Sequence, residues 1–244
     1  MAKADFVRRA VRSASSAGRT TVLLTGFGPF PGVAVNATMI LVPKLAQLAR
    51  QQFPGVEFVA DVLPTEWVAA PKRVNDMLKT YRPDVVLHFG VSSRARGFEI
   101  ETRGLNVCAM APDAVGALPK GERIALRGPD EIRSLLPVAD IVQRLRRRGL
   151  KAYASRDAGT YLCNRTLFHV LSMERKYPEL MRAGFIHVPS SLVAGGIMTS
   201  NRYLRSGPAS PLSWRGALVG GLDIIGGCLA QPVRIDVRSV NRIA

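Results

Sequence analysis

The sequence has few cysteines and no long hydrophobic run, and each absence excludes a class of protein. The three cysteines, Cys108, Cys163 and Cys228, are too few and too widely spaced in 244 residues for a disulfide scaffold or a CxxC metal site. Hydrophobic residues make up 47% of the chain, but no stretch approaches the roughly 18 apolar residues of a membrane span. We therefore expect a soluble, cytoplasmic protein without a membrane partner.

Acidic residues are also scarce, with 18 against 34 lysines and arginines, which gives a formal net charge of +16. Such a charge is compatible with nucleic-acid binding. The 27 arginines and 7 lysines are nevertheless spread along the chain and form no patch interleaved with aromatic residues, so we expect no nucleic-acid partner. The basic start, residues 1–20, lacks the apolar core of a secretory signal and is predicted to be a flexible tail.

Hydrophobic patterning predicts alternating strands and helices in the first half of the chain. Apolar runs at 21–27, 57–63 and 84–89 indicate buried strands, and helical spacing covers 36–52, with Asn36 as the N-cap, and 66–81. This β-α-β-α-β order predicts an α/β protein, a three-layer α/β/α sandwich with a mainly parallel central sheet. Functional loops of such a fold lie at the carboxyl ends of the strands.

The second half predicts further elements of the same domain. Region 91–137 is rich in glycine, proline and charge, with one strand expected at 99–107. Helices are expected at 138–148, 162–176 and 214–230, strands at 152–155 and 184–188, and a long loop at 190–210. We expect one catalytic domain at 21–230 and a tail or edge segment at 231–244.

Two polar residues occupy positions where reactive groups are expected. Cys163 follows a Gly-Thr turn in AGTYLCN, at the start of a predicted helix, where unpaired N–H groups and the helix dipole favour a thiolate. His187 ends the apolar strand of GFIHVP, where its side chain can face the mouth of the sheet. Taken singly, each residue is more often structural, because most free cysteines behave as small buried apolar groups.

A family resemblance joins these residues. The strings TGFGPFPGVAVN, HFG, FEIETRGLN, AGTYLCN and GFIHVP follow one another over about 21–189 and resemble the blocks of the pyrrolidone-carboxylate peptidase (pyroglutamyl peptidase I) family of cysteine peptidases. The resemblance implies that Cys163 is the nucleophile, His187 the acid–base group and Glu101 the residue that supports the imidazolium. Glu99, two residues away on the same face of an extended strand, is the rival of Glu101.

The resemblance also implies a pocket for the flat lactam ring of a pyroglutamyl residue. The expected substrate-binding residues are Phe27 and Phe30 as apolar walls, Asn36 as a hydrogen-bonding group, and Thr65, Val91, Tyr161 and Leu162. The chain departs from the family pattern at 92–96, at Thr102 and over 107–116, which flank the expected site.

The function implied by the resemblance is hydrolysis of N-terminal pyroglutamyl residues from peptides, without a metal or organic cofactor, by a homodimer or homotetramer. Two alternatives stay open. One is a divergent cysteine amidohydrolase of the same fold with a different acyl substrate, and the other is a catalytically silent binding protein.

Overall fold

The computed structural model describes residues 19–174, 176–177, 180, 182–195, 198–199, 202–203, 211–233 and 237–243. Of the tail expected at 1–20, the first 18 residues therefore lie outside the described part. None of the helices within it is long and apolar enough to cross a membrane.

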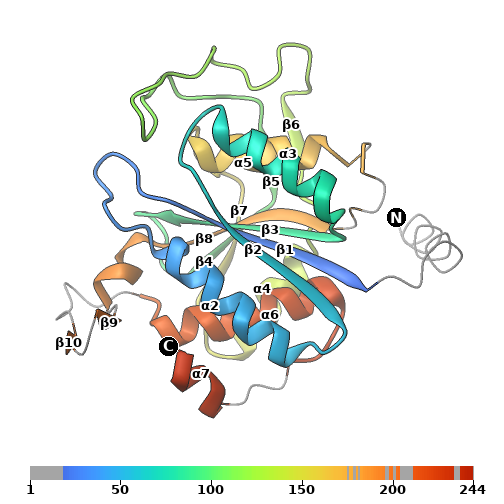
Figure 1. Cartoon of the computed structure of the whole chain (residues 1–244), viewed down its shortest axis with the longest axis vertical. Helices are drawn as coiled ribbons and strands as arrows, with labels where there is room; N and C mark the ends of the chain where they lie inside the picture. Colours follow the sequence, from blue (N-terminus) through green and yellow to red (C-terminus); the bar gives the residue numbers. More distant parts are fainter. Residues whose placement is uncertain are drawn as a thin grey trace, which may run out of the picture.

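A six-stranded sheet in the order β2-β1-β3-β8-β4-β7 forms the middle of the molecule (Figure 1). Its strands, in chain order, are β1 (Thr20–Phe27), β2 (Val56–Leu63), β3 (Val85–Ser92), β4 (Phe98–Glu101), β7 (Ala152–Ser155) and β8 (Arg182–Pro189). Strands β2, β1, β3 and β8 run parallel, whereas β4 is antiparallel to β8 and parallel to β7. The sheet is mainly parallel, as predicted, and its direction changes between β8 and β4.

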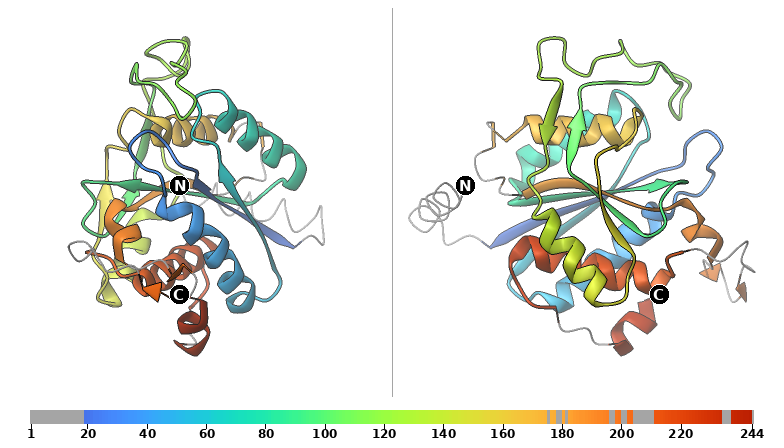
Figure 2. Two further views of the ribbon diagram at one scale, coloured as in Figure 1. Left: turned by 60° about the vertical axis from the view of Figure 1, so that its left-hand side comes forward. Right: turned by 180° about the vertical axis from the view of Figure 1, so that it is seen from behind.

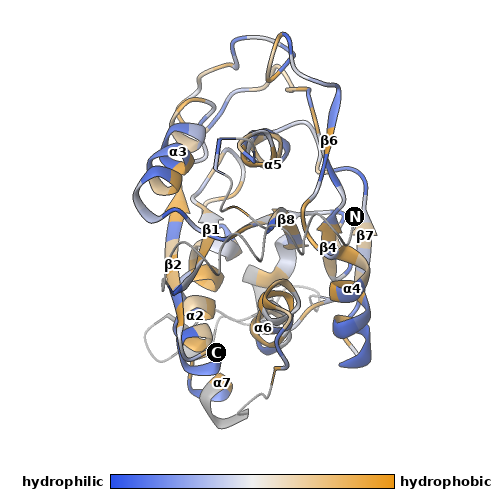
Figure 3. Cartoon of the chain, turned by 90° about the vertical axis from the view of Figure 1, so that its right-hand side faces the viewer, coloured by the Kyte–Doolittle hydropathy of each residue, from blue (hydrophilic) through white to orange (hydrophobic). Residues whose placement is uncertain are grey.

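Helices cover both faces of this sheet, which confirms the predicted three-layer sandwich (Figure 3). Helices α3 (Ala69–Tyr81) and α5 (Leu162–Ser172) cover one face, and α2 (Ala37–Gln52), α4 (Val138–Arg147) and α6 (Trp214–Leu229) cover the other. Alternate strand residues supply the two cores: Val22 and Leu24 of β1 pack on the α2 side, whereas Leu23 packs on the α3 side. Burial on both faces explains the nearly continuous apolar strands.

The region predicted as one strand at 99–107 is divided between two sheets. β4 ends at Glu101, and β5 (Arg103–Leu105) instead pairs antiparallel with β6 (Glu131–Arg133). Thr102 bonds to the carbonyl of Ser155 through both its N–H and its hydroxyl group, and the chain then passes so close to α5 that a Cβ on Gly104 would lie 2.9 Å from the Phe168 backbone. The segment between β5 and β6 extends beyond the α3/α5 layer (Figure 2).

Two later segments also differ from the predicted elements. Within the expected loop at 190–210, the described residues form a 3₁₀ helix, Ser190–Gly195, and a short antiparallel pair, β9 (Met198–Thr199) and β10 (Arg202–Tyr203). The expected tail or edge segment at 231–244 contains a helix, α7 (Val237–Ile243). Val240 is buried in the α2-side core and Ile243 packs against it, so their spacing of three residues presents one apolar helix face.

Candidate active site

A cavity of about 370 Å³ lies at the carboxyl ends of β1, β3 and β8, next to the start of α5. Nearly all the residues expected at the site line it, namely Phe27, Phe30, Asn36, Thr65, Val91, Tyr161, Leu162, Cys163 and His187. Glu101 is the exception, because it lies behind His187 and is fully buried. The structure therefore brings together residues that are spread over some 160 positions of the sequence.

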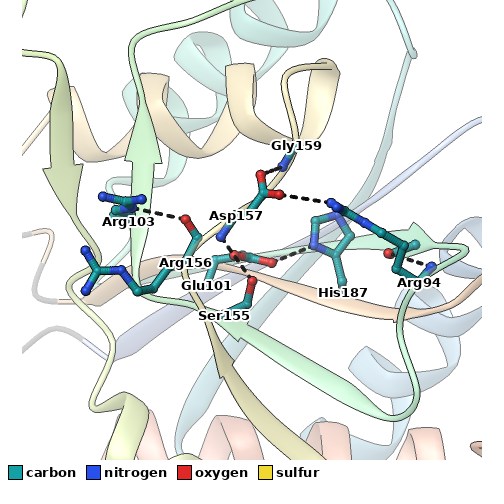
Figure 4. A network of polar contacts seen from close by, with 9 residues as sticks. Arg94, Glu101, Arg103, Ser155, Arg156, Asp157, Gly159 and His187 are labelled. Atoms are coloured by element: carbon teal, nitrogen blue, oxygen red, sulfur yellow. Dashed lines mark hydrogen bonds and ion pairs between the residues drawn. The ribbon is translucent and has the colours of Figure 1, made fainter.

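Cys163, His187 and Glu101 form a connected polar chain. Nδ1 of His187 lies 2.8 Å from Oε1 of Glu101 (Figure 4). His187 also interacts with the Cys163 side chain, and this interaction raises the pKa of the imidazole. Hence the imidazole is held between a carboxylate and a thiol, the arrangement that lets a histidine take and return the thiol proton.

Interactions with Cys163 and Glu101 favour the protonated form of the His187 imidazole. Burial is the largest influence and by itself would lower the pKa of His187. Attraction to Cys163, hydrogen bonds to Cys163 and Glu101, and the charge of Glu101 outweigh burial and raise that pKa to about 10. A protonated imidazole beside the sulfur is the partner that stabilises a nucleophilic thiolate.

The antiparallel pairing of β4 with β8 explains why two glutamates lie near the histidine. Glu99 is paired directly with His187, and Glu101 follows two residues later on the same face of β4. Glu101 makes the hydrogen bond to Nδ1, whereas Glu99 is only half-buried and burial raises its pKa. Ligand-type atoms of Glu99, Glu101 and His187 lie within 4.8 Å of one another. Oε1 of Glu101 and Nδ1 of His187 are hydrogen-bonded to each other, so we interpret this cluster as an acid–base network rather than as a set of metal ligands.

The start of α5 presents free backbone donors beside the thiol. Tyr161 is the N-cap residue and makes no side-chain capping bond. The first helical hydrogen bond runs from the Arg165 N–H to the Tyr161 carbonyl, so the N–H groups of Leu162, Cys163 and Asn164 precede it. Such groups, together with the helix dipole, can bind an anion.

Aromatic side chains form the apolar wall of the cavity. Phe27 packs against Phe185 with ring centroids 6.0 Å apart, and Phe30 packs against Tyr161 at 6.3 Å. Tyr161 also meets Trp67 edge-on at 5.1 Å, and its hydroxyl donates a hydrogen bond to the Pro112 carbonyl. The wall is thus fixed from behind by the segment between β5 and β6.

Asn36 and Thr65 support the loop between β1 and α2. The Asn36 Nδ2 and the Thr65 hydroxyl both donate to the Gly28 carbonyl, at 3.3 and 3.0 Å. The Asn36 Oδ1 accepts from the N–H and the hydroxyl of Thr38, which confirms Asn36 as the N-cap of α2. Both side chains line the cavity, and their hydrogen bonds position the loop that carries Phe30.

Sequence reasoning missed several residues of the site. One of them is Gly90, where a Cβ would lie 2.6 Å from the Phe185 ring and 3.2 Å from the Cys163 sulfur. Asn164 is fully buried and bonds to the backbone of Leu105 and Val107, which ties α5 to β5. Further lining comes from Val33, Ser92, Ser93, Arg94, Asp157, Ala158, Gly159 and Ser190. Contacts between distant segments leave no local sequence pattern.

The other cysteines and histidines lie away from the cavity. Cys108 and Cys228 are buried, and burial raises the pKa of both thiols, that of Cys228 to about 12. His88 is fully buried, which lowers its pKa to about 3, and His169 contacts Asn75 on α3. Cys163 and His187 are thus the thiol and imidazole that share the cavity lining.

Similarity to known proteins covers most of this site. A family model described as "Pyroglutamyl peptidase" matches residues 20–198. A "Pyrrolidone-carboxylate peptidase" of Chromobacterium violaceum is 38% identical over 170 residues, which cover 69% of this chain and 77% of that protein. A protein of the same description from Yersinia pestis is 32% identical over 169 residues, with coverage of 69% and 77%.

Solved structures give the same result. The pyroglutamyl peptidase I of Bacillus amyloliquefaciens superposes with a TM-score of 0.71 at 27% identity and covers 87% of this chain and 98% of its own. A mutant pyrrolidone carboxyl peptidase of Pyrococcus furiosus superposes with a TM-score of 0.73 at 26% identity, with coverage of 86% and 99%.

Proposed function

The chain belongs to the pyroglutamyl peptidase family, and from this premise we propose that it is a cysteine peptidase that removes N-terminal pyroglutamyl residues from peptides. In this proposal Cys163 is the nucleophile, His187 the acid–base group and Glu101 the residue that orients and stabilises the imidazolium. One observation carries it: His187 is hydrogen-bonded to Glu101 and shares the wall of a largely apolar cavity with Cys163, whose interaction with the imidazole raises the pKa of His187.

The acylation step follows from these positions. The Cys163 sulfur attacks the carbonyl carbon of the pyroglutamyl residue, and the backbone N–H groups at the start of α5 stabilise the resulting oxyanion. The C–N bond then breaks, and His187 gives its proton to the leaving amine. The product of this step is a thioester between Cys163 and the pyroglutamyl group.

Deacylation uses the same groups in reverse order. His187, now neutral, takes a proton from a water molecule that attacks the thioester carbonyl. The C–S bond breaks, free pyroglutamate leaves, and the proton on His187 restores the ion pair with Cys163. Glu101 keeps Nδ1 protonated throughout, so that Nε2 is the nitrogen that exchanges protons.

The cavity wall supports specificity for the lactam ring. The ring is flat and uncharged, and Phe27, Phe30 and Tyr161 offer it aromatic surface. An open-chain glutamyl residue would bring a carboxylate and an ammonium group against this surface. An unpaired buried charge costs several kcal/mol, on the order of a thousandfold or more in relative rate.

Hydrolysis of four chromogenic amides under reducing conditions tests the proposal. We expect cleavage of the pyroglutamyl amide and not of the glutamyl, glutaminyl or prolyl amide, of which the last lacks the ring carbonyl. Preference for another amide would favour a divergent amidohydrolase of the same fold. Cleavage of none would favour a silent binding protein.

We also propose a domain organisation, a cellular compartment and an oligomeric state for the enzyme. We place residues 21–230 in a single catalytic domain and the enzyme in the cytoplasm, where a reducing environment keeps Cys163 as a thiol. We also propose a homo-oligomer, a dimer or tetramer, and light scattering coupled to gel filtration would measure its mass.

A further inference from the structure

The cavity has a polar side in addition to its aromatic wall. Ser92 ends β3 and Arg94 lies in the loop after it, whereas Asp157 and Gly159 come from the loop after β7. Figure 4 shows the Arg94 and Asp157 side chains pointing toward one another, with Arg94 Nη2 3.2 Å from Asp157 Oδ2. If the aromatic wall holds the pyroglutamyl ring, this polar side remains for the residue that leaves.

Local hydrogen bonds fix the backbone on both sides of the pair. The Arg94 N–H donates to the Ser92 hydroxyl at 3.2 Å, and the Asp157 N–H donates to the Ser155 hydroxyl at 3.2 Å. The Gly159 N–H donates to Asp157 Oδ1 at 2.9 Å. The two loops are therefore shaped by their own turns, and the bridge between the side chains is not needed to hold them.

The ion pair between Arg94 and Asp157 is exposed to solvent, so a ligand can readily replace one of its partners. The Arg94 and Asp157 side chains are 71% and 58% exposed, and ion pairs of such exposure contribute little stability. Within the described part of the chain, the Arg94 guanidinium makes this one hydrogen bond, although it has five N–H donors. A ligand carboxylate can thus bind Arg94 beside Asp157 or in its place, with the paired geometry that guanidinium and carboxylate groups favour.

Arg94 is the guanidinium group on this side of the cavity. Asp157 is the carboxylate of the described lining, whereas Arg94 is followed by Arg96, whose Nη1 donates to the carbonyls of Ser93, Arg94 and Ala95. Arg96 lies outside the cavity lining, so Arg94 is the guanidinium that Asp157 pairs with there. Displacement of Asp157 by a substrate carboxylate would leave Arg94 paired with a carboxylate.

We infer that Arg94 determines specificity for a carboxylate on the leaving side of the substrate. The inference rests on the proposed function, because it needs the pyroglutamyl ring on the aromatic wall. The carboxylate has two possible sources. It is either the side chain of an acidic residue that follows pyroglutamate or the C-terminal carboxylate of a pyroglutamyl dipeptide.

Two matched substrate pairs separate these sources. Pyroglutamyl-glutamate α-amide and pyroglutamyl-glutaminamide differ in side-chain charge, and pyroglutamyl-alanine and pyroglutamyl-alaninamide differ in the terminal carboxylate. We expect kcat/KM of the parent enzyme to favour the charged member of at least one pair by roughly three- to tenfold at low salt. The preference should shrink as ionic strength rises, because the pair is exposed.

Three variants identify the residue responsible. Arg94→Gln should bring the ratio to about one, and Asp157→Asn, which removes the competing carboxylate, should raise it. Arg73→Gln is the matched control, because Arg73 forms an ion pair with Asp61 outside the cavity and its loss changes the net charge equally. The control should keep the ratio of the parent enzyme.

The outcomes are distinguishable from failure of the proposed function. Cleavage of the neutral substrates without any charge preference, or a preference that survives in Arg94→Gln, would overturn the role of Arg94 and leave the peptidase assignment intact. Loss of the preference in Arg73→Gln would attribute it to overall charge and overturn the role as well. Cleavage of no pyroglutamyl substrate would overturn both.

Discussion

Substitution of Glu101 by glutamine keeps the size of the side chain but removes its negative charge from a fully buried position. Glu101 is fully buried, with Oε1 on His187 Nδ1 and Oε2 without a hydrogen-bond partner among the described atoms. In the variant, one amide orientation leaves an NH₂ group buried where Oε2 was. The other orientation turns the NH₂ toward Nδ1 and selects the wrong imidazole tautomer. Both orientations are unfavourable.

The size of the effect follows from the bond that is weakened. A hydrogen bond to a charged group contributes about 1.5–3 kcal/mol, and the loss of that amount from the transition state lowers the rate by roughly ten- to hundredfold. Replacement of His187 by alanine removes the proton carrier itself, so we expect nearly complete loss in that variant. Glu101→Gln should therefore be impaired clearly but less than His187→Ala.

The assay is kcat/KM for a chromogenic pyroglutamyl amide under reducing conditions, with circular dichroism to verify the fold of each variant. Glu99→Gln is the matched control, because Glu99 lies on the same face of β4 but does not make the bond to Nδ1. We expect Glu99→Gln to retain most of the activity. Normal activity of Glu101→Gln together with loss in Glu99→Gln would transfer the supporting role to Glu99.

Three further predictions follow from the same geometry. Cys163→Ala should abolish turnover in a folded protein, whereas Cys108→Ala and Cys228→Ala should stay active; turnover by Cys163→Ala would refute the mechanism. Because its folded-state pKa is raised to about 10, His187 stabilises the fold fully below about pH 6.5, and this contribution is lost as pH rises toward 10. Urea unfolding of parent and His187→Asn should show their difference shrinking over that window, and a constant difference would contradict it. Gly90→Ala should lower kcat on the order of a hundredfold, because its Cβ would lie 2.6 Å from the Phe185 ring and 3.2 Å from the Cys163 sulfur and would displace both; a parental kcat would show that the site adapts.

The sequence was sufficient to predict the layers and most strands, because their signals are local. The strand over β1 and the helix after Asn36 were predicted within one residue, since an apolar run and a cap are properties of neighbouring residues. The predicted strand at 99–107 is instead interrupted at Thr102, where the turn depends on a hydrogen bond to the Ser155 carbonyl of another strand. Sequence periodicity does not contain such a partner.

The candidate site also combines residues that have a local sequence signal with residues that depend on contacts between distant segments. Cys163 and His187 could be proposed as candidates because each begins or ends an element with a recognisable pattern. The choice of Glu101 over Glu99 needed the family resemblance, because both lie on the same strand face. Arg94 and Asp157 could not be paired from the sequence, since 63 residues separate them and their contact depends on how two loops meet.

The shared hydrogen bonds of Asn36 and Thr65 to the Gly28 carbonyl have a consequence for the thermodynamics of substrate binding. These bonds fix the loop that carries Phe30, and Asn36 also joins that loop to α2. A wall that is already ordered loses little conformational entropy when the lactam ring enters. Binding of the lactam ring to this preformed apolar pocket should accordingly show a favourable enthalpy and a negative change in heat capacity.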